Sequence, residues 1–400
     1  MSKPSRRVVA DRCPGVFSTH EAADGAVARV RLPGGRIGPD QLALLAQAAG
    51  AHGDGFLELT ARGNLQLRGI GDVDAVAEKV IEAGLAPSST HDKVRNIEVS
   101  PLTGRIGGIA DVAPLAGALD FRLRTEEWSA ELSGRFLFGV DDGRGDIRRH
   151  RPDVCALARE IDGPDIVADI LVDDELLGSA RGVEMIVDAV LDVAHTLVDS
   201  APGTWRIGDL TPDERSAVED RVRTRLLPVV GGSDDADSDT AASARPAHAP
   251  AVGEPIVGWF DQDDGRVLLG AVVELGRIPA RLAEFIAAVG APVIVTPDRE
   301  ILLCDLGEEV AETVVRVLAP MGLIFDATSP WARVSCCVGA PGCANATSPV
   351  REDLLVHIRD GEDIGDREHW VGCPRGCGSP AVPHDRVVAD PDGGYRTQRR

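Results

Sequence analysis

Two stretches of the chain show the same succession of apolar and polar positions. Strands are predicted where apolar residues alternate with polar ones or run together over a short segment, and helices where apolar residues recur every three or four positions. The first stretch gives strand, helix, strand, strand and helix at residues 25–32, 39–50, 56–60, 65–70 and 73–83. The second gives the same order at residues 267–273, 279–289, 292–296, 301–306 and 309–318.

The two stretches agree in residues as well as in pattern. Gly35-Arg36-Ile37 matches Gly276-Arg277-Ile278, and LTARGNLQLRGI around Thr60 aligns without gaps with VTPDREILLCDL around Thr296. Chance similarity between two ordinary α/β stretches is the alternative, but these shared positions favour an internal duplication. We therefore expect the strands around the two threonines to superpose and to lie next to each other in one sheet.

Between the repeats lies a segment that is too polar to pack. Residues 231–252 read GGSDDADSDTAASARPAHAPAV and carry almost no large apolar side chain, so burial cannot offset the entropy cost of ordering them. We expect a disordered linker there. The long segment before it contains an amphipathic helix at 182–200, whose apolar face is expected to lie in a core and consists of Val183, Ile186, Val190, Val193 and Leu197.

The charge of the chain argues against several kinds of partner. Lys plus Arg number 42 and Asp plus Glu number 64, so the net charge is −22, which does not suit nucleic acid or an anionic membrane surface. The chain has no run of eighteen apolar residues, and residues 1–12 lack the apolar core of a signal peptide. We expect a cytoplasmic protein, in which the eight cysteines are ligands or free thiols rather than disulfides.

Four of the cysteines form two closely spaced pairs. Cys337 and Cys343 have five residues between them, and after a further 29 residues come Cys373 and Cys377, with three residues between them. Both pairs lie in segments rich in Gly and Pro, CCVGAPGCANA and GCPRGCGSP. Four thiolates arranged in this way can hold a 4Fe-4S cluster, because glycines let backbone N–H groups approach the anionic sulfurs.

A structural zinc site is the alternative for these cysteines. Zinc-binding pairs are more often separated by two to four residues, so the spacing favours the cluster. Cys336 is adjacent to Cys337 and could replace it as a ligand, although the spacing to Cys343 favours Cys337. The isolated Cys155 and Cys304 are expected to be buried and to behave as small apolar side chains.

The cysteine spacing and the duplication together resemble the sulfite/nitrite reductase superfamily. Its members consist of two pseudo-symmetric halves, each a ferredoxin-like half-domain followed by an α+β domain, and the second half holds a 4Fe-4S cluster through C-x5-C and C-x3-C. The resemblance covers nearly the whole chain and implies the same α+β fold. It divides the chain into half-domain 1, a sulfite/nitrite-reductase-like domain, the linker, half-domain 2 and a 4Fe-4S cluster domain, at residues 13–88, 89–230, 231–252, 253–322 and 323–400.

The same resemblance implies which residues bind a tetrapyrrole. In the superfamily a T-x-R strand supplies an arginine to tetrapyrrole carboxylates, and a guanidinium can bind a carboxylate through two bonds. Arg62 in TARGNLQLRG matches that arginine, and the segment HDKVRNIEVSP resembles the block that follows it. The substrate-binding residues implied are Arg62, Asn64, Gln66, Arg68, Arg95, Asn96 and, from a later block, Arg135.

One departure points to a particular branch of the superfamily. Where sirohaem-dependent reductases carry Lys-Phe-Lys facing the substrate anion, this chain has Arg135-Phe136-Leu137, and no lysine follows Lys93. The opening Cys13-Pro14-Gly15 and the segment HWVGCPRGC at 369–377 resemble the precorrin-3B synthase family. That family hydroxylates precorrin-3A with O2 and closes a lactone in aerobic cobalamin biosynthesis, which is the reaction that the resemblance implies here.

The resemblance also implies cofactors and partners. These are a 4Fe-4S cluster on the four paired cysteines, a mononuclear non-haem iron, the tetrapyrrole precorrin-3A, O2 and an external electron donor. The chain has no G-x-G-x-x-G after a strand, so electrons would come from a ferredoxin or from NADH bound without that motif. The sequence does not place that iron. His357, His369 and His384 lie near the cluster cysteines in sequence, although a lone histidine is more often structural, and Asp141 and Asp142, in a loop expected to be exposed, are equally weak candidates.

Two other functions remain open at the level of sequence. One is a sulfite or nitrite reductase that holds sirohaem, which its colour after purification would reveal. The other is a non-catalytic carrier of a cluster or a tetrapyrrole. A full duplicated scaffold is more structure than a carrier requires, so an enzyme is favoured.

Overall fold

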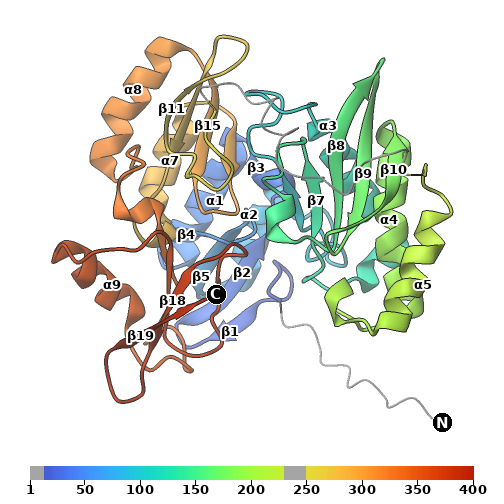
Figure 1. The fold of residues 1–400 in the computed structure, drawn as a ribbon. Helices are drawn as coiled ribbons and strands as arrows, with labels where there is room; N and C mark the ends of the chain where they lie inside the picture. Colours follow the sequence, from blue (N-terminus) through green and yellow to red (C-terminus); the bar gives the residue numbers. More distant parts are fainter. Residues whose placement is uncertain (1–12, 229–248) are drawn as a thin grey trace. The chain divides into compact units, whose positions relative to one another are not determined.

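The structure is a computed structural model that describes residues 13–228 and 249–400. These residues form two compact units, which we describe one at a time (Figure 1). The middle unit contains residues 88–228, and the repeat unit contains residues 14–87 and 249–400. Residues 231–248 of the expected linker lie outside the described residues.

Both predicted repeats are present in the repeat unit. The first comprises β1 (His20–Ala22), β2 (Gly25–Val30), β3 (Arg36–Ile37), α1 (Pro39–His52), β4 (Phe56–Leu59), β5 (Leu65–Ile70) and α2 (Val73–Glu82). The second comprises β11 (Gly258–Asp261), β12 (Val267–Ala271), β13 (Arg277–Pro279), α7 (Ala280–Ala288), β14 (Val293–Val295), β15 (Ile301–Leu306) and α8 (Glu308–Leu318). Each helix and strand that the apolar pattern predicts is found, with ends shifted by at most a few residues.

The two repeats exchange a short strand. β3 of the first repeat pairs with β14 of the second, and β13 of the second pairs with β4 of the first. The two sheets therefore have the strand orders β1-β2-β5-β4-β13 and β11-β12-β15-β14-β3. Our expectation that strands 56–70 and 292–306 lie next to each other in one sheet is wrong. The exchanged strands already occupy the edges of β4 and β14, so these two strands have no edge left for pairing with each other.

A single apolar core runs through both repeats. Leu42 and Leu45 of α1 and Ile286 of α7 are at most 2% exposed and belong to one cluster with the inward-facing residues of both sheets. α1 and α7 approach closely at Gly50, where an added Cβ would lie 3.5 Å from the Cβ of Ala280. The helices of the two repeats thus share one interior, and the α+β fold with two pseudo-symmetric halves is confirmed.

The turns between paired strands have the same hydrogen bonds in both repeats. Thr60 Oγ1 accepts from the N–H of Asn64 at 3.1 Å, and Thr296 Oγ1 accepts from the N–H of Glu300 at 3.1 Å. Each threonine N–H donates to the carbonyl of the same partner residue at 3.0 Å. These matching bonds agree with the gapless alignment made from the sequence.

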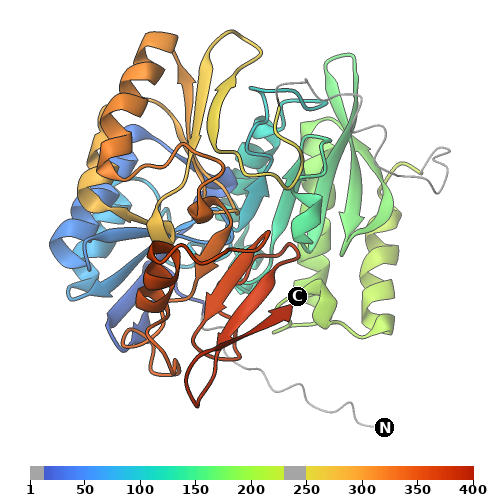
Figure 2. The same cartoon turned by 60° about the vertical axis from the view of Figure 1, so that its left-hand side comes forward.

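A third, smaller sheet completes the repeat unit. It has the order β16 (Val334–Cys336), β17 (Glu368–Val371), β18 (Asp385–Ala389) and β19 (Tyr395–Arg399). The first three strands are parallel and β19 is antiparallel (drawn in red in Figure 2). Helix α9 (Val350–Arg359) packs on β16 and β17 through Val350 and Leu354, which contact Trp370.

The middle unit is one sheet with helices on one face. The sheet has the order β10-β9-β8-β7-β6, and α3 and α5 flank α4 on that face. The strands are β6 (Ile97–Val99), β7 (Phe138–Asp141), β8 (Val154–Asp162), β9 (Asp165–Val172) and β10 (Glu175–Arg181). The helices are α3 (Ala113–Thr125), α4 (Val183–Ser200) and α5 (Pro212–Arg223). The expected apolar face of α4 is confirmed, since four of its five predicted residues are buried and Val183 packs at the edge of the core.

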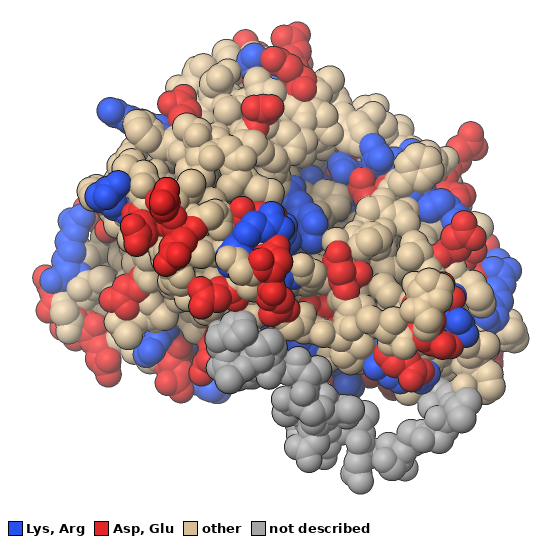
Figure 3. All heavy atoms as spheres, turned by 90° about the horizontal axis from the view of Figure 1, so that it is seen from above, with Lys and Arg blue, Asp and Glu red and all other residues tan. Residues whose placement is uncertain are grey.

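The surface carries its charge mostly as pairs of opposite sign. On the face in view in Figure 3, acidic and basic side chains are interspersed. Many arginines bond carboxylates, as in the pairs Arg148–Asp174 at 2.6 Å and Arg215–Asp173 at 2.7 Å. Within the described residues, no helix is both long and apolar enough to cross a membrane.

The buried Thr296 turn gives a test of the duplicated fold. We expect Thr296→Val to lower the free energy of unfolding by about 1–3 kcal/mol, because the N–H and the carboxyl of Glu300 lose their buried hydrogen-bond partner. The matched control is Thr313→Val on the exposed side of α8, which should change stability by less than about 0.5 kcal/mol. Urea unfolding of both variants measures the difference, and equal effects would contradict a role for the turn.

Candidate cluster and tetrapyrrole site

The two cysteine pairs lie at the carboxyl ends of neighbouring parallel strands. Cys337 directly follows β16, and Cys373 follows β17 after one residue. Since β16 and β17 are adjacent, their ends bring the two loops side by side. The N–H of Cys337 donates to the carbonyl of Trp370 at 2.9 Å, and the N–H of Gly372 donates to the sulfur of Cys337 at 3.3 Å.

Cys377 lies close enough to the other paired thiols to link them electrostatically. Burial raises the pKa of Cys337, and the neighbouring Cys377 and Cys373 raise it further. Burial also raises the pKa of Cys377, with further contributions from Cys373 and Cys343. The structure therefore gathers Cys337, Cys343, Cys373 and Cys377 at one place, where mutual repulsion of thiolates would be relieved by a bound cation or cluster.

The spread of the sulfurs separates two kinds of metal site. A tetrahedral zinc ion with Zn–S bonds of about 2.3 Å holds its sulfurs about 3.8 Å apart. Among the described residues, no three cysteine sulfurs lie within 4.8 Å of one another. A cubane, with one iron per thiolate, keeps the four sulfurs further apart than a single zinc ion does. The described cysteine sulfurs therefore do not form the compact set that a single zinc ion needs.

Glycines let the loops come close to their surroundings. Gly339 has φ 68°, and a Cβ there would lie 2.6 Å from the backbone nitrogen of Val350. A Cβ on Gly372 would lie 2.7 Å from the Cβ of Ala346. Larger residues could not hold these positions without moving the loop, so the glycines let both cysteine loops pack closely against residues 346–350. We call these closely packed loops the glycine cradle.

The remaining cysteines lie in other environments. Burial raises the pKa of Cys336 to about 12, which keeps it a neutral thiol, and its electrostatic neighbours include Arg351 and Arg299. Because successive residues of a strand point to opposite faces, Cys336 and Cys337 are directed differently. Cys155 and Cys304 are 2% and 0% exposed, as expected of small apolar side chains.

A row of polar side chains crosses the first repeat's sheet on the face away from its core. Arg29, Gln66, Glu58 and Arg277 stand opposite one another on β2, β5, β4 and β13. Arg29 donates to Gln66 at 3.0 Å, Gln66 donates to Glu58 at 3.0 Å, and Arg277 lies 3.3 Å from Glu58. Arg29, Glu58 and Arg277 were not predicted as site residues from the sequence. For Arg29 a signal existed, because the alternation in VARVRL at 27–32 puts Arg29 and Arg31 on one face of the strand.

The predicted residues of the first repeat lie on or beside this polar row. Arg62 is half-buried in the Thr60 turn. Asn64 is 1% exposed and accepts from the N–H of Leu32 at 2.8 Å. Arg68 forms two bonds with Asp24, at 2.9 and 3.1 Å, and donates to the carbonyl of Gly342 at 3.3 Å. The structure therefore places Arg68 against the first cysteine loop.

The remaining predicted residues belong to the middle unit. Arg95 is buried and bonds Asp120 at 2.6 and 3.2 Å. The amide of Asn96 donates to the carbonyls of Lys93 and Gly134, at 3.1 and 2.8 Å. The guanidinium of Arg135, which is exposed, lies 4.3 Å from the centre of the Trp205 ring. Leu137, next but one in the chain, is 3% exposed.

Of the three histidines considered as iron ligands, His369 and His384 are neighbours, with ring centroids 6.0 Å apart. His369 is fully buried, and its Nε2 donates to the carbonyl of Cys377 at 3.0 Å while its Nδ1 accepts from Ser335 at 2.8 Å. Burial, and after it the charge of Arg299, lowers the pKa of His369 to about 3, so the ring stays neutral. His384 bonds the carbonyl of Val382 through Nδ1, and His357 packs on the Trp370 ring.

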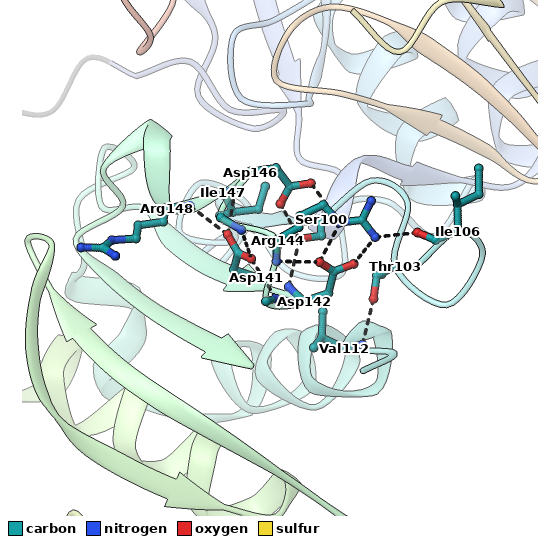
Figure 4. A network of polar contacts seen from close by, with 12 residues as sticks. Ser100, Thr103, Ile106, Val112, Asp141, Asp142, Arg144, Asp146, Ile147 and Arg148 are labelled. Carbon is teal, nitrogen blue, oxygen red and sulfur yellow. Dashed lines mark hydrogen bonds and ion pairs between the residues drawn. The ribbon is translucent and has the colours of Figure 1, made fainter. Parts of the chain in front are cut away.

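Asp141 and Asp142, expected in an exposed loop, are fully buried at the end of β7, so that expectation is wrong. Figure 4 shows them in a network with Arg144, Asp146 and Ser100. Asp141 accepts from four backbone N–H groups, those of Gly143, Gly145, Ile147 and Arg148, at 2.9–3.1 Å.

The other carboxylates of this network also have partners. Asp142 pairs with Arg144 through bonds of 2.6 and 2.8 Å, and Asp146 accepts from Ser100 at 2.5 Å. Burial, with the charges of Asp141 and Asp142, raises the pKa of Asp146 to about 8. Three carboxylates facing one guanidinium thus keep one proton near neutral pH. The network organises the loop after β7, and one oxygen of each of Asp141, Asp142 and Asp146 lies within 4.8 Å of the others, a spacing at which three carboxylates could also hold a cation.

Comparison with known proteins gives relatives along most of the chain. Residues 20–83 match the Nitrite/Sulfite reductase ferredoxin-like half domain. The chain is 27% identical over 399 residues to a precorrin-3B synthase of Sinorhizobium sp, which covers 95% of this chain and 81% of that protein. It is 23% identical over 434 residues to the hemoprotein beta-component of the NADPH sulfite reductase of Chromohalobacter salexigens, covering 92% of this chain and 74% of that protein.

A solved structure has the same fold. The NirA protein of Mycobacterium tuberculosis superposes with a TM-score of 0.69, covering 94% of this chain and 73% of the NirA chain. The sequences are 16% identical, so this likeness concerns the fold alone. Together with the matched half domain, it agrees with the architecture built up from the two repeats and the cysteine loops.

The buried Asp146 predicts a pH dependence of stability. Between about pH 4 and pH 8 the folded chain keeps a proton on Asp146 that the unfolded chain has released, so its contribution to stability falls as pH rises through that window. The slope is at most about 1.4 kcal/mol per pH unit. Asp146→Asn should remove this slope, so the variant gains stability relative to the wild type from pH 5 to pH 8. Urea unfolding across that range measures it.

Asp220→Asn, at an exposed position on α5, is the matched control and should keep the wild-type slope. If Asp146→Asn also keeps the wild-type slope, the retained proton lies elsewhere or is absent.

Proposed function

We propose that this chain, a homologue of precorrin-3B synthase, hydroxylates precorrin-3A with O2 and closes the lactone in aerobic cobalamin biosynthesis. Its homologues are enzymes, and the chain is an oxidoreductase of the same superfamily. Similarity to the synthase extends over nearly the whole chain, which supports the proposal beyond the shared half domain.

The observation that carries the proposal is the loss of a cation at Leu137. The resembling block of sirohaem reductases places two lysines toward the substrate anion, whereas this chain has an arginine and a leucine there and no lysine after Lys93. Leu137 is 3% exposed. If the blocks were misaligned, Arg135 or Arg148 could take the place of the lysine, but Arg148 is bonded to Asp174 at 2.6 Å. Reduction of a small anion needs concentrated positive charge around it, so this loss favours a large tetrapyrrole as the substrate.

We further propose that Cys337, Cys343, Cys373 and Cys377 hold a 4Fe-4S cluster. The convergence of the four thiols, the glycine cradle and the N–H donor from Gly372 support this assignment. When bound, the cluster would supply electrons one at a time to the reaction. The external donor would be a ferredoxin-type protein or NADH, and the mononuclear iron that the resemblance implies would be a second cofactor.

For the tetrapyrrole, we propose that Arg62 in the repeat unit binds a carboxylate. Arg95 and Arg135, which belong to the middle unit, are the further carboxylate-binding residues that the resemblance implies. Asn64 holds the Thr60 turn on the chain at Leu32, and Gln66 links Arg29 to Glu58, so both would keep the binding strand in place. Asn96 would do the same for the segment that carries Arg95, through its bond to Gly134. The ring itself would be held by these charge-assisted bonds and by shape.

A sirohaem-dependent sulfite or nitrite reductase is the second candidate. It is favoured by the similarity to a sulfite reductase hemoprotein over 92% of this chain. In that case sirohaem would occupy the carboxylate-binding residues assigned here to the substrate, and the purified protein would carry its colour.

The cluster assignment predicts the outcome of replacing one ligand. Cys373→Ser should remove the brown colour and most of the iron and acid-labile sulfide, because a serine hydroxyl is a poor ligand for this cluster. Cys304→Ala, a buried cysteine outside the loops, is the matched control and should keep both. Metal analysis after anaerobic purification decides the question, and a colourless wild type containing zinc would refute the cluster.

The substrate assignment predicts a binding defect in Arg62→Ala. Losing one charge-assisted bond costs about 1.5–3 kcal/mol, so precorrin-3A binding should weaken roughly ten- to hundredfold. Arg316→Ala, on the exposed side of α8, is the matched control and should bind like the wild type. The enzyme should be active with Leu137 in place, without a lysine at that position.

The reaction itself is tested with the cluster-loaded enzyme and two sets of substrates. With reductant, O2 and precorrin-3A, we expect the tetrapyrrole to gain one oxygen atom. With sulfite or nitrite under anaerobic conditions, we expect no product. Formation of sulfide or ammonia with an unchanged tetrapyrrole would return the chain to the reductases.

A further inference from the structure

Each repeat sends one arginine to one of the two cysteine loops. Arg68, on β5 of the first repeat, donates through Nη2 to the carbonyl of Gly342 at 3.3 Å. Arg299, in the Thr296 turn of the second repeat, donates through Nη2 to the carbonyl of Gly378. Gly342 directly precedes Cys343, and Gly378 directly follows the last cysteine of the other pair. Both contacts therefore fall on the backbone beside a proposed cluster ligand.

The side chain of Arg68 is held in place by its surroundings. Its guanidinium is held in a two-bond fork by Asp24, at 2.9 and 3.1 Å, and the side chain is buried. A Cβ on Gly342 would lie 2.7 Å from Asp24 Oδ2, so the loop passes directly over the ion pair. A guanidinium fixed in this way meets the carbonyl of Gly342 with little loss of side-chain entropy.

The contact of Arg299 requires an unusual backbone. Arg299 has φ 67°, a conformation that side-chain-bearing residues rarely take, and the aligned residue of the first repeat is Gly63 with φ 61°. A glycine would satisfy the turn more easily, so the arginine is retained against a conformational cost. Its neighbour Asp298 bonds Arg367 at 2.6 Å, and the charged groups around Arg299 are Cys336, Asp298 and Arg367.

Other side chains tie down the same second loop. His369 Nε2 donates to the carbonyl of Cys377 at 3.0 Å, and Ser335 fixes the ring from the other side at 2.8 Å. Arg386 donates to the hydroxyl of Ser379 at 2.9 Å, and a Cβ on Gly376 would lie 2.6 Å from the Arg386 guanidinium carbon. Two consecutive carbonyls, those of residues 377 and 378, thus each accept from a different element.

We propose that Arg68 and Arg299 are positioning residues that anchor the two cysteine loops by their backbone carbonyls, so that each copy of the repeat fixes one pair of thiols. The expected effect on the cluster rests on the proposed function, whereas the anchoring contacts do not. A 4Fe-4S cluster with four thiolates is an anion, and a cation beside it favours the reduced, more negative state. Arg299 should do so more than Arg68, whose charge is paired with Asp24.

The test uses the full chain and two independent readouts. Arg299→Gln should raise amide hydrogen exchange in residues 373–379 at least about tenfold while leaving 337–343 unchanged, and Arg68→Gln should do the reverse. Asp24→Asn, which loosens the fork while keeping Arg68, should act like Arg68→Gln to a smaller degree. Arg266→Gln is the matched control, because its guanidinium bonds Asp264 in a hairpin turn and touches neither cysteine loop in the described contacts.

The second readout is the reduction potential of the cluster, followed by its spectrum. For Arg299→Gln we expect the ratio of reduced to oxidised cluster to fall about tenfold at a fixed potential, which corresponds to 59 mV for one electron. Arg299→Lys, which retains the charge, should recover most of that shift. A merely structural role would change stability without moving the potential or being rescued by lysine.

The outcomes separate this inference from the proposed function. A wild-type protein that never holds iron would refute the cluster, and the exchange experiment would still show whether the arginines anchor the loops. The anchoring is overturned if amide hydrogen exchange in both cysteine loops of Arg68→Gln and Arg299→Gln matches that of the control Arg266→Gln. It is also overturned by a cluster-loaded Arg299→Gln with an unchanged potential and spectrum.

Discussion

The exchange of one short strand between the repeats is the interaction on which the repeat unit depends. β3 closes the sheet of the second repeat and β13 closes the sheet of the first, so neither five-stranded sheet is complete without residues from the other copy. An uncovered strand edge would leave backbone donors and acceptors unpaired. The exchange covers the edges of β4 and β14 and brings α1 against α7 over a shared core.

The threonine turn shows how the two copies can differ in sequence while keeping the same backbone. Both contain the same threonine turn, with the same hydrogen bonds, so the scaffold of the turn does not depend on its other residues. In the first copy the turn has Arg62 and a glycine, and in the second it has Asp298 and Arg299. A turn whose geometry is fixed by one threonine is free to present different charges, one set toward a proposed substrate and the other toward a cysteine loop.

The parts of the structure that could be predicted are those recorded in local sequence. The repeated order of elements follows from apolar spacing, the turns follow from the aligned threonines, and the cysteine pairs follow from their spacing in glycine-rich loops. The exchanged strands could not be read, because Arg36–Ile37 is only two residues long and carries no apolar period. Without it, adjacent pairing of β4 and β14 was the natural expectation.

Polar contacts between residues far apart in the chain could not be predicted from the sequence either. Asp141 and Asp142 stand in the segment DDGRGD, whose letters are typical of an exposed loop, yet four backbone N–H groups fold over Asp141 and bury it. Arg68 was expected to bind the tetrapyrrole because of the family resemblance, and its contact with Gly342 joins residues 274 positions apart. Sequence alone gives the residue type and the face of the strand, and only the fold gives the partner.

The strand exchange has a consequence for how such a protein could have arisen. A chain with a single repeat would carry a sheet that lacks its last strand and a short strand that has no sheet of its own. Two identical copies would satisfy both needs by trading that strand, which is the geometry of a domain-swapped homodimer with a two-fold axis. Joining the copies in one polypeptide makes the association independent of concentration and allows each copy to lose the symmetry that a homodimer must keep.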